Sequence, residues 1–368
     1  MDFNLILNGK NEFFPKLNNK TYQILVIDNK ENEKYMFQII NNFNEGYVGI
    51  DLEFNHVSKE KMDVALMQLN LENDSDNIGH IFLLDPGELS DDNYNNLIHL
   101  LTKNNIIKIV HGAESLDITY LFNQLLITKE NINKFCNNLY DTRYLCEYYK
   151  ILYESSIDTE TSENKIKCGI YNLLLLLNII TPNKIEEFDE IENQMGPIWL
   201  IKINVNNLSI PLLKYALYDV IFLPELLKKF LNFKNIYYTN IIPEITTLIY
   251  KYKKNVENQF LHLEKLIGKM NINFVFIHNK RYLLQEIYQI FYNELFENIK
   301  EINYFRNFFK IITKFIIYYN IYKKYKIFTK ANDHLTNINF EFFLNWLTRY
   351  KNINQFIIEY NEIIEECV

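Results

Sequence analysis

Two acidic side chains stand two residues apart in the stretch YVGIDLEF, at Asp51 and Glu53. The stretch is rich in β-branched and aromatic residues and bounded by polar turns, which predicts a strand over residues 47–54. Side chains two apart in a strand project from the same face, so the two carboxylates would repel each other unless a cation neutralises them. Carboxylate oxygens are ligands that suit Mg²⁺ or Mn²⁺. Taken alone, the pair also fits an ordinary acidic strand end.

Further candidate groups follow later in the chain. Asp117 lies in the first turn of a helix predicted over residues 115–126, at the carboxyl end of the preceding strand, where open α/β sheets collect ligands. A helix dipole alone would also favour an acid there. Tyr215 and Asp219 are four residues apart on a helix predicted over residues 209–231, and therefore share a face. An ordinary surface pair has the same spacing.

The order and context of these pieces resemble the DEDDy group of 3′-to-5′ exonucleases, which have the ribonuclease H-like fold. GIDLEF followed by VALMQLN resembles the first motif and the next strand of the ribonuclease D branch, and IFLLDP resembles its third strand. IVHGAESLDITYL is similar to the second motif, LYDTRYL to the Asp-Thr after it, and KYALYDVIFLPEL to the third motif. The resemblance covers residues 45–231 and is closest to ribonuclease D and the distributive exonuclease subunit of the eukaryotic exosome.

This resemblance implies hydrolysis with two divalent metal ions, Mg²⁺ or Mn²⁺. Asp51 would bridge the ions, Glu53 and Asp219 would bind the ion nearer the attacking water, and Asp117 would help to hold the second through water. Tyr215 would orient that water, because a phenol with a pKa near 10 is a poor base at neutral pH. These five residues are the predicted catalytic set, and the four acids are the predicted metal ligands.

Three further residues are predicted to bind substrate. Phe54 follows Glu53 and could stack on the terminal base, where stacking contributes about 1–3 kcal/mol, although a core aromatic fits as well. The branch usually has Trp followed by Arg-Pro-Leu before its third motif, whereas here Trp199 is followed by LIKINVNN, so Lys202 replaces the arginine only in part. We interpret His111 as a turn histidine bonded to backbone rather than as a catalytic group.

The pattern of elements predicts an α/β fold, a ribonuclease H-like mixed sheet flanked by helices, followed by an all-α C-terminal domain. Three predicted strands separated by loops favour an antiparallel meander, and the later alternation of strands with helices favours parallel pairing. The meander strands cover residues 47–54, 64–71 and 80–84. We predict an N-terminal extension packed on the core over residues 1–45, the exonuclease domain over 46–234 and a helical domain over 235–368.

Basic runs interleaved with tyrosine occur in the predicted helical domain, KYKK at residues 251–254 and YKKYK at 322–326. They could bind phosphates while the rings stack on bases, but the small excess of positive charge favours a solvated lysine-rich helix face. The net charge of −8 argues against a general nucleic-acid binder, although the chain after residue 235 is mildly basic.

Composition and hydropathy predict an intracellular protein, cytoplasmic or nuclear. The four cysteines are irregularly spaced, no signal peptide is recognisable, and no apolar stretch approaches the roughly 20 residues that a membrane-spanning helix needs.

Nucleic acid is the predicted partner, and the His-Gly-Ala turn favours RNA over DNA. Two other functions stay open: a DNA-directed 3′-to-5′ exonuclease, and an inactive exonuclease fold that binds RNA or acts as a scaffold. The intact set of acids argues against the inactive form.

Overall fold

The computed structural model describes residues 4–7, 10–13, 20–58, 61–156, 166–234, 237–253, 274–277 and 280–283. The chain divides into two compact units, residues 1–143 with 168–238, and residues 144–167 with 239–368. All the predicted site residues belong to the first unit. Within the described residues, no helix has the length and apolar character needed to cross a membrane.

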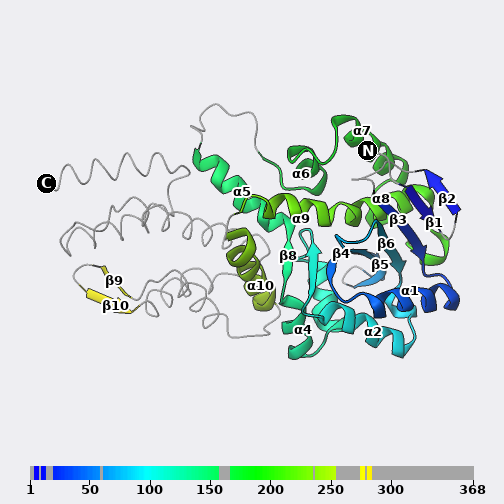
Figure 1. Cartoon of the computed structure of the whole chain (residues 1–368), viewed down its shortest axis with the longest axis horizontal. Coiled ribbons are helices and arrows are strands. Elements are labelled where there is room, and N and C mark those ends of the chain that lie inside the picture. Colours follow the sequence, from blue (N-terminus) through cyan, green and yellow to red (C-terminus); the bar gives the residue numbers. More distant parts are fainter. Residues whose placement is uncertain are drawn as a thin grey trace. The chain divides into compact units, whose positions relative to one another are not determined.

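An eight-stranded mixed sheet forms the centre of the first unit, in the order β2-β1-β3-β6-β5-β4-β7-β8 (Figure 1). Its strands are β1 (Asn4–Leu7), β2 (Lys10–Phe13), β3 (Thr21–Val26), β4 (Gly46–His56), β5 (Met62–Glu72), β6 (Ile78–Leu84), β7 (Ile106–Val110) and β8 (Leu139–Asp141). Strands β4, β5 and β6 form the predicted antiparallel meander, and β7 and β8 continue the sheet in parallel. The predicted mixed sheet is therefore confirmed.

The N-terminal residues enter the sheet, which differs from the expected extension packed on the core. Strand β3 pairs in parallel with β6, and β1 pairs in parallel with β3. The hydroxyl of Tyr22 on β3 donates a hydrogen bond to Oε2 of Glu72 on β5, at 2.7 Å and in a buried position.

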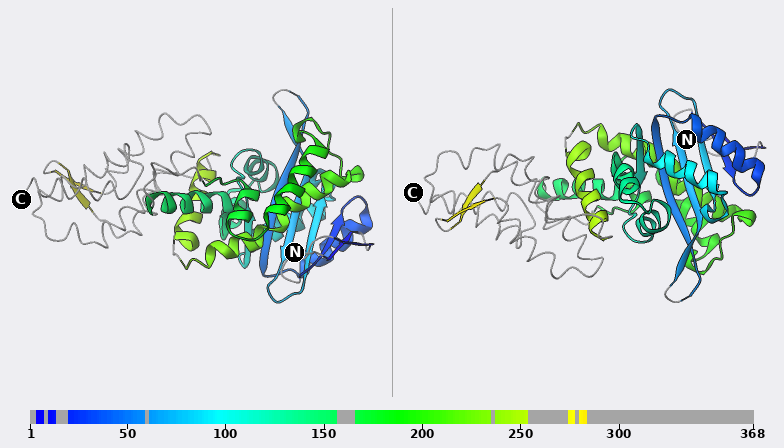
Figure 2. Two further views of the ribbon diagram at one scale, coloured as in Figure 1. Left: turned by 90° about the horizontal axis from the view of Figure 1, so that it is seen from above. Right: turned by 90° about the horizontal axis from the view of Figure 1, so that it is seen from below.

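Helices cover both faces of this sheet (Figures 1 and 2). One face carries α1 (Lys30–Asn42), α2 (Asp91–Thr102) and α4 (Lys129–Cys136), and the other carries α8 (Ile210–Ile221) and α9 (Leu223–Leu231). The remaining helices of the first unit are α3 (Leu116–Tyr120), continued by a π-helical turn at Leu121–Leu125, α6 (Ile170–Leu176) and α7 (Pro182–Met195). Buried leucines at helical spacing, such as Leu97 and Leu101 of α2, attach these helices to the sheet.

The single helix predicted over residues 209–231 is two helices, because the chain breaks at Phe222 between α8 and α9. Pro224 lacks a backbone N–H and cannot continue the hydrogen-bond ladder to Val220. The side-chain amide of Asn70 supplies the missing donor, since its Nδ2 bonds to the carbonyl oxygen of Val220 at 3.2 Å. A buried asparagine on β5 therefore fixes the end of the helix that carries Tyr215 and Asp219.

The second unit contains α5 (Thr142–Ser156, of which residues 144–156 belong here), a π-helical turn at Tyr237–Ile241 (of which residues 239–241 belong here), α10 (Ile242–Lys253) and a hairpin of β9 (Phe274–Ile277) with β10 (Lys280–Leu283). The expectation of helix throughout residues 235–368 is wrong at this hairpin. The rest of that predicted domain, including the basic run at 322–326, lies outside the described residues.

The cysteines are not all free thiols. Cys146 and Cys168 are each disulfide-bonded, and Cys136 is buried.

Candidate active site

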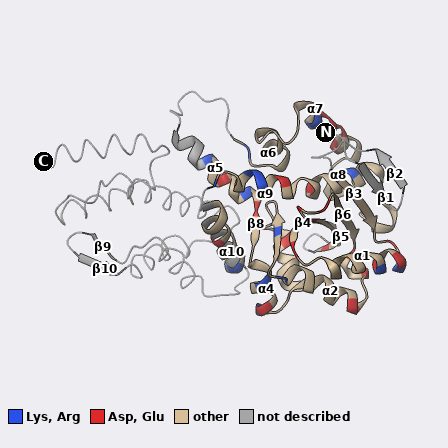
Figure 3. Cartoon of the chain, in the orientation of Figure 1, with Lys and Arg blue, Asp and Glu red and all other residues tan. Residues whose placement is uncertain are grey.

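The acids of the first and third motifs meet at one point of the first unit. One carboxylate oxygen each from Asp51, Glu53 and Asp219 lies within 4.8 Å of the other two, and all three residues are half-buried. Asp51 and Glu53 come from strand β4, and Asp219 comes from helix α8, which packs on that strand (Figure 3). Residues more than 160 positions apart in the chain therefore form one acidic cluster.

The close approach of α8 to the sheet depends on Gly49. Gly49 on β4 is paired with Asn70 on β5. A Cβ atom added at Gly49 would lie 3.1 Å from the carbonyl oxygen of Val220, tighter than most such contacts. Because Val220 directly follows Asp219, the small residue at position 49 and the amide of Asn70 together set the height of Asp219 above β4.

Crowding and burial raise the pKa of each acid in the cluster. Loss of water by burial raises the pKa of the Asp51 carboxyl to about 7. Burial, and then the charges of Asp51, Asp219 and Asp117, raise the pKa of Glu53 well above its ordinary value. Burial and the charge of Asp51 do the same for Asp219. Keeping three such carboxylates ionised at neutral pH therefore costs free energy. A bound cation would remove that cost.

Two tyrosines contact the cluster. The hydroxyl of Tyr215 on α8 is hydrogen-bonded to Glu53 and to Asp219. The hydroxyl of Tyr171 on α6 donates to Oδ1 of Asp219 at 3.3 Å. The charge of Asp219, and then burial, raise the pKa of Tyr215 further above 10, so this phenol stays protonated at neutral pH.

Asp117 lies in the first turn of α3, as predicted, but is not one of the three acids within 4.8 Å of one another. Its charge nevertheless contributes to raising the pKa of Glu53, so Asp117 lies near enough to Glu53 to influence that carboxyl. The structure therefore brings together Asp51, Glu53, Asp219 and Tyr215, with Asp117 at the margin.

The turn before Asp117 is held by the carboxylate of Asp141. The backbone N–H groups of Gly112 and Ala113 donate to Asp141, at 2.9 Å to Oδ1 and 3.2 Å to Oδ2. Gly112 has a φ of +69°, a conformation that favours glycine. Nδ1 of His111 lies 2.8 Å from Oγ1 of Thr142, and burial lowers the pKa of His111 to about 3. A neutral, hydrogen-bonded His111 agrees with its interpretation as a turn residue.

The three predicted substrate-binding residues differ in exposure. Trp199 lies in a short 3₁₀ helix, Ile198–Leu200, with 63% of its surface exposed. Lys202 is exposed as well, and Phe54 is half-buried beside an irregularity in the pairing of β4 with β5. Two 2.8 Å hydrogen bonds join the side-chain amide of Asn55 to the backbone N–H and carbonyl of Ile203. The segment that carries Trp199 and Lys202 is thus tied to the strand of the paired acids.

Sequence reasoning missed three polar groups at or beside the site. These are Tyr171, Asn55 and Gln68, whose side-chain amide is buried on β5 opposite Asp51. Tyr171 and Asn55 lie too far along the chain from their partners for any spacing rule. Gln68 could have been found, because polar residues alternate with apolar ones in QLNLE at the end of β5.

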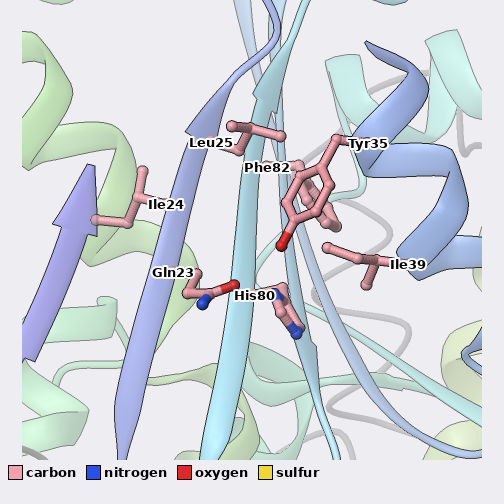
Figure 4. A pocket seen from close by; sticks show the side chains of 7 residues that line it. All are labelled: Gln23, Ile24, Leu25, Tyr35, Ile39, His80 and Phe82. Carbon is pink, nitrogen blue, oxygen red and sulfur yellow. The ribbon is translucent and has the colours of Figure 1, made fainter. Parts of the chain in front are cut away.

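A separate pocket of about 210 Å³ lies between strands β3 and β6 and helix α1 (Figure 4). Its walls are formed by Gln23, Ile24, Leu25, Tyr35, Ile39, His80 and Phe82. None of the predicted site residues lines it, so it is not part of the acidic cluster.

The chain is similar to known proteins in sequence and in fold. An uncharacterized protein of Acanthamoeba polyphaga mimivirus, L533, is 30% identical over 278 residues, which are 68% of this chain and 52% of that protein. The chain thus spans about half the length of this curated relative.

Solved structures of ribonuclease D are also similar, at low identity. The Trypanosoma brucei enzyme with GMP is 17% identical, covers 67% of this chain and 72% of its own, and has a TM-score of 0.45. The Escherichia coli enzyme is 15% identical, covers 68% and 61%, and has a TM-score of 0.41. A family model described as 3′-5′ exonuclease matches residues 24–233, more than half of the chain. The chain belongs to the 3′-5′ exonuclease family.

Proposed function

We propose that this protein is a metal-dependent exonuclease that removes nucleotides one at a time from the 3′ end of RNA. The observation that carries the proposal is the cluster of Asp51, Glu53 and Asp219, whose carboxylate oxygens lie within 4.8 Å of one another. On a 3′-5′ exonuclease domain, a cluster of this kind would hold metal ions that promote phosphodiester hydrolysis.

The donor set fits Mg²⁺ or Mn²⁺. Hard carboxylate oxygens suit both ions, and neutralisation of the cluster would favour the ionised form of each acid. Asp51, Glu53 and Asp219 would hold the metal, and Asp117 would help to hold a second ion through water. When bound, a pair of divalent ions stabilises the entering and leaving oxygens of an in-line displacement at phosphorus.

Tyr215 would orient the attacking water and not deprotonate it. The neighbouring charges and burial keep the phenol protonated, so it can donate a hydrogen bond but cannot act as a base near neutral pH. Its contacts with Glu53 and Asp219 fix the direction of the hydroxyl group. Positioning of this type contributes to catalysis by keeping the reacting atoms aligned.

Substrate contacts would come from the segment after α7 and from the end of β4. Trp199 offers an exposed aromatic ring for stacking on a base, Lys202 offers a charge for a backbone phosphate, and Phe54 would pack against the terminal base. Stacking and phosphate contacts accept any base sequence. The preference for RNA is supported by the His-Gly-Ala turn and its likeness to the ribonuclease D branch.

The proposal is tested by incubating the full chain with single-stranded RNA and with DNA of the same sequence, with Mn²⁺, with Mg²⁺ or with EDTA. We expect metal-dependent shortening of RNA, slower shortening of DNA, and loss of both with Asp51→Asn. Glu130→Gln is the matched control, because Glu130 is an exposed carboxylate paired with Lys134 on α4. Cleavage that persists in EDTA, or that Asp51→Asn leaves intact, would exclude the metal-dependent mechanism.

A further inference from the structure

A buried amide on β5 has neither its donor nor its acceptor used. Gln68 is 0% exposed, and its Nε2 and Oε1 atoms are both buried without a hydrogen-bond partner among the described residues. A buried polar group left unpaired destabilises the folded protein. Its strand neighbours Met67 and Leu69 are fully buried and apolar, so a residue selected for packing alone would be apolar too.

Asp51 on β4 is the residue that lies directly opposite Gln68. Strands β4 and β5 are antiparallel, and Asp51 is paired directly with Gln68. Side chains of directly opposed residues lie on the same face, with Cβ atoms about 4.5–5.5 Å apart. The preceding pair on this face, Gly49 with Asn70, lies beneath Val220 of α8. Gln68 is therefore one step further along the face toward the acidic cluster.

The other polar residues on this face of β5, Asn70 and Glu72, each bond to other groups of the protein, although Oδ1 of Asn70 is also buried without a partner among the described residues. Nδ2 of Asn70 bonds to the end of α8, and Glu72 is bound by Tyr22, Lys20 and Lys228 at 2.7, 3.1 and 2.9 Å. Of these three residues of β5, Gln68 lies opposite an acid of the cluster, and neither of its polar atoms has a protein partner among the described residues.

We propose that Gln68 is a positioning residue of the metal centre, an inference that rests on the proposed function. Its Nε2 would donate to the carboxylate of Asp51 and its Oε1 would accept a hydrogen bond from a water molecule of the hydrated cation. Magnesium and manganese sites of this kind retain several waters, and outer hydrogen bonds orient the ligands that hold the ion. The unpaired amide is then a stability cost of the metal-free protein that metal binding relieves.

The test is Gln68→Met, which keeps the length of the side chain and removes both polar atoms. Calorimetric titration of the full chain with Mn²⁺, in the absence of nucleic acid, should show binding weakened by about 10- to 100-fold. The melting temperature of the metal-free variant should be equal to or higher than that of the wild type, because an unpaired amide has been removed. Leu69→Met is the control, since Leu69 is buried on the opposite face of β5 and the substitution conserves volume.

Gln68 is instead a plain core residue if Gln68→Met binds Mn²⁺ as tightly as the wild type and Leu69→Met, whatever its melting temperature. Should methionine prevent folding, Gln68→Leu is titrated in its place, and the same result would overturn the proposal. Failure of the proposed function has a different signature, because the wild type itself would then bind no Mn²⁺ or would bind it without hydrolysing RNA.

Discussion

The hydroxyl of Tyr171 donates a hydrogen bond to Oδ1 of Asp219 across 3.3 Å, although the two residues are 48 positions apart in the chain. The ring of Tyr171 packs on Phe188 of α7 with 4.4 Å between centroids, and Phe188 packs on Tyr218 of α8 at 4.8 Å. An aromatic stack thus links α6 and α7 to the helix that carries Asp219. Tyr171 is therefore held in place by packing that is independent of the acids.

Tyr171→Phe should lower kcat by about tenfold and weaken Mn²⁺ binding, because Asp219 loses a hydrogen bond that fixes its carboxylate while the stack of rings is retained. Steady-state kinetics over a range of Mn²⁺ concentrations would measure both effects. Tyr94→Phe is the control, since that hydroxyl bonds to the carbonyl of Gln124 at 2.7 Å outside the cluster. Equal kinetics for the two variants would show that Tyr171 is a bystander.

Tyr215→Phe should lower kcat by about one to three orders of magnitude, as expected for a lost positioning contact. The affinity for Mn²⁺ measured by calorimetry should change little, because a protonated phenol is a poor ligand for these ions. Asp219→Asn should lose metal binding and provides the comparison. If Tyr215→Phe loses metal as severely as Asp219→Asn, or cleaves RNA at the normal rate, its role as the water-orienting residue is wrong.

Asn55→Asp should raise KM for single-stranded RNA by about tenfold with little change in kcat. The carboxylate can accept from the N–H of Ile203 but cannot donate to its carbonyl, so one of the two 2.8 Å bonds is lost. The chain has two tryptophans, Trp199 and Trp346. In a Trp346→Phe background, quenching of Trp199 fluorescence by RNA reports on this segment directly. If both the quenching and KM equal those of the wild type, Asn55 has no role in substrate binding.

Gly49→Ala should reduce both stability and kcat. The added methyl group would meet the carbonyl of Val220 at 3.1 Å and push α8 away from β4, at a cost of about 1–3 kcal/mol. Because Asp219 moves with α8, kcat per folded molecule should fall by at least about tenfold. Gly79→Ala is the control, since its methyl group would crowd Tyr22 instead. It should lower the melting temperature without changing kcat, and a similar loss of kcat in both variants would contradict the argument.

The metal-free protein should lose stability as the pH rises from about 4 toward 7. Burial raises the pKa of Asp51 in the folded state to about 7, so the folded chain binds more protons than the unfolded chain in this range. The melting temperature in EDTA should therefore decline with pH more steeply in the wild type than in Asp51→Asn, which cannot ionise at this position. Parallel curves for the two proteins would show that the pKa of Asp51 is not raised in the folded state.

The acidic cluster could be predicted because each acid lies in an element with a clear sequence pattern. Strand β4 alternates around Asp51 and Glu53, and Tyr215 and Asp219 lie one helical turn apart. The order of these residues along the chain indicated the 3′-to-5′ exonuclease family. The break at Phe222 was missed, although Pro224 cannot continue a helix.

Other parts of the site depend on tertiary contacts that no local pattern encodes. The bond from Tyr171 to Asp219 joins two helices separated by α7, and the bonds from Asn55 to Ile203 span 148 residues. Strand β3 was missed as part of the sheet because six residues such as TYQILV have too little context to show which strand they pair with.

Metal-dependent trimming from the 3′ end can be followed with 5′-labelled single-stranded RNA and Mn²⁺ over time on a sequencing gel. We expect a ladder of products that shorten from the 3′ end by single nucleotides with the wild type, and an intact band with Asp51→Asn. Release of the labelled 5′ nucleotide as the first product, cleavage at internal positions, or an identical ladder from Asp51→Asn would contradict it.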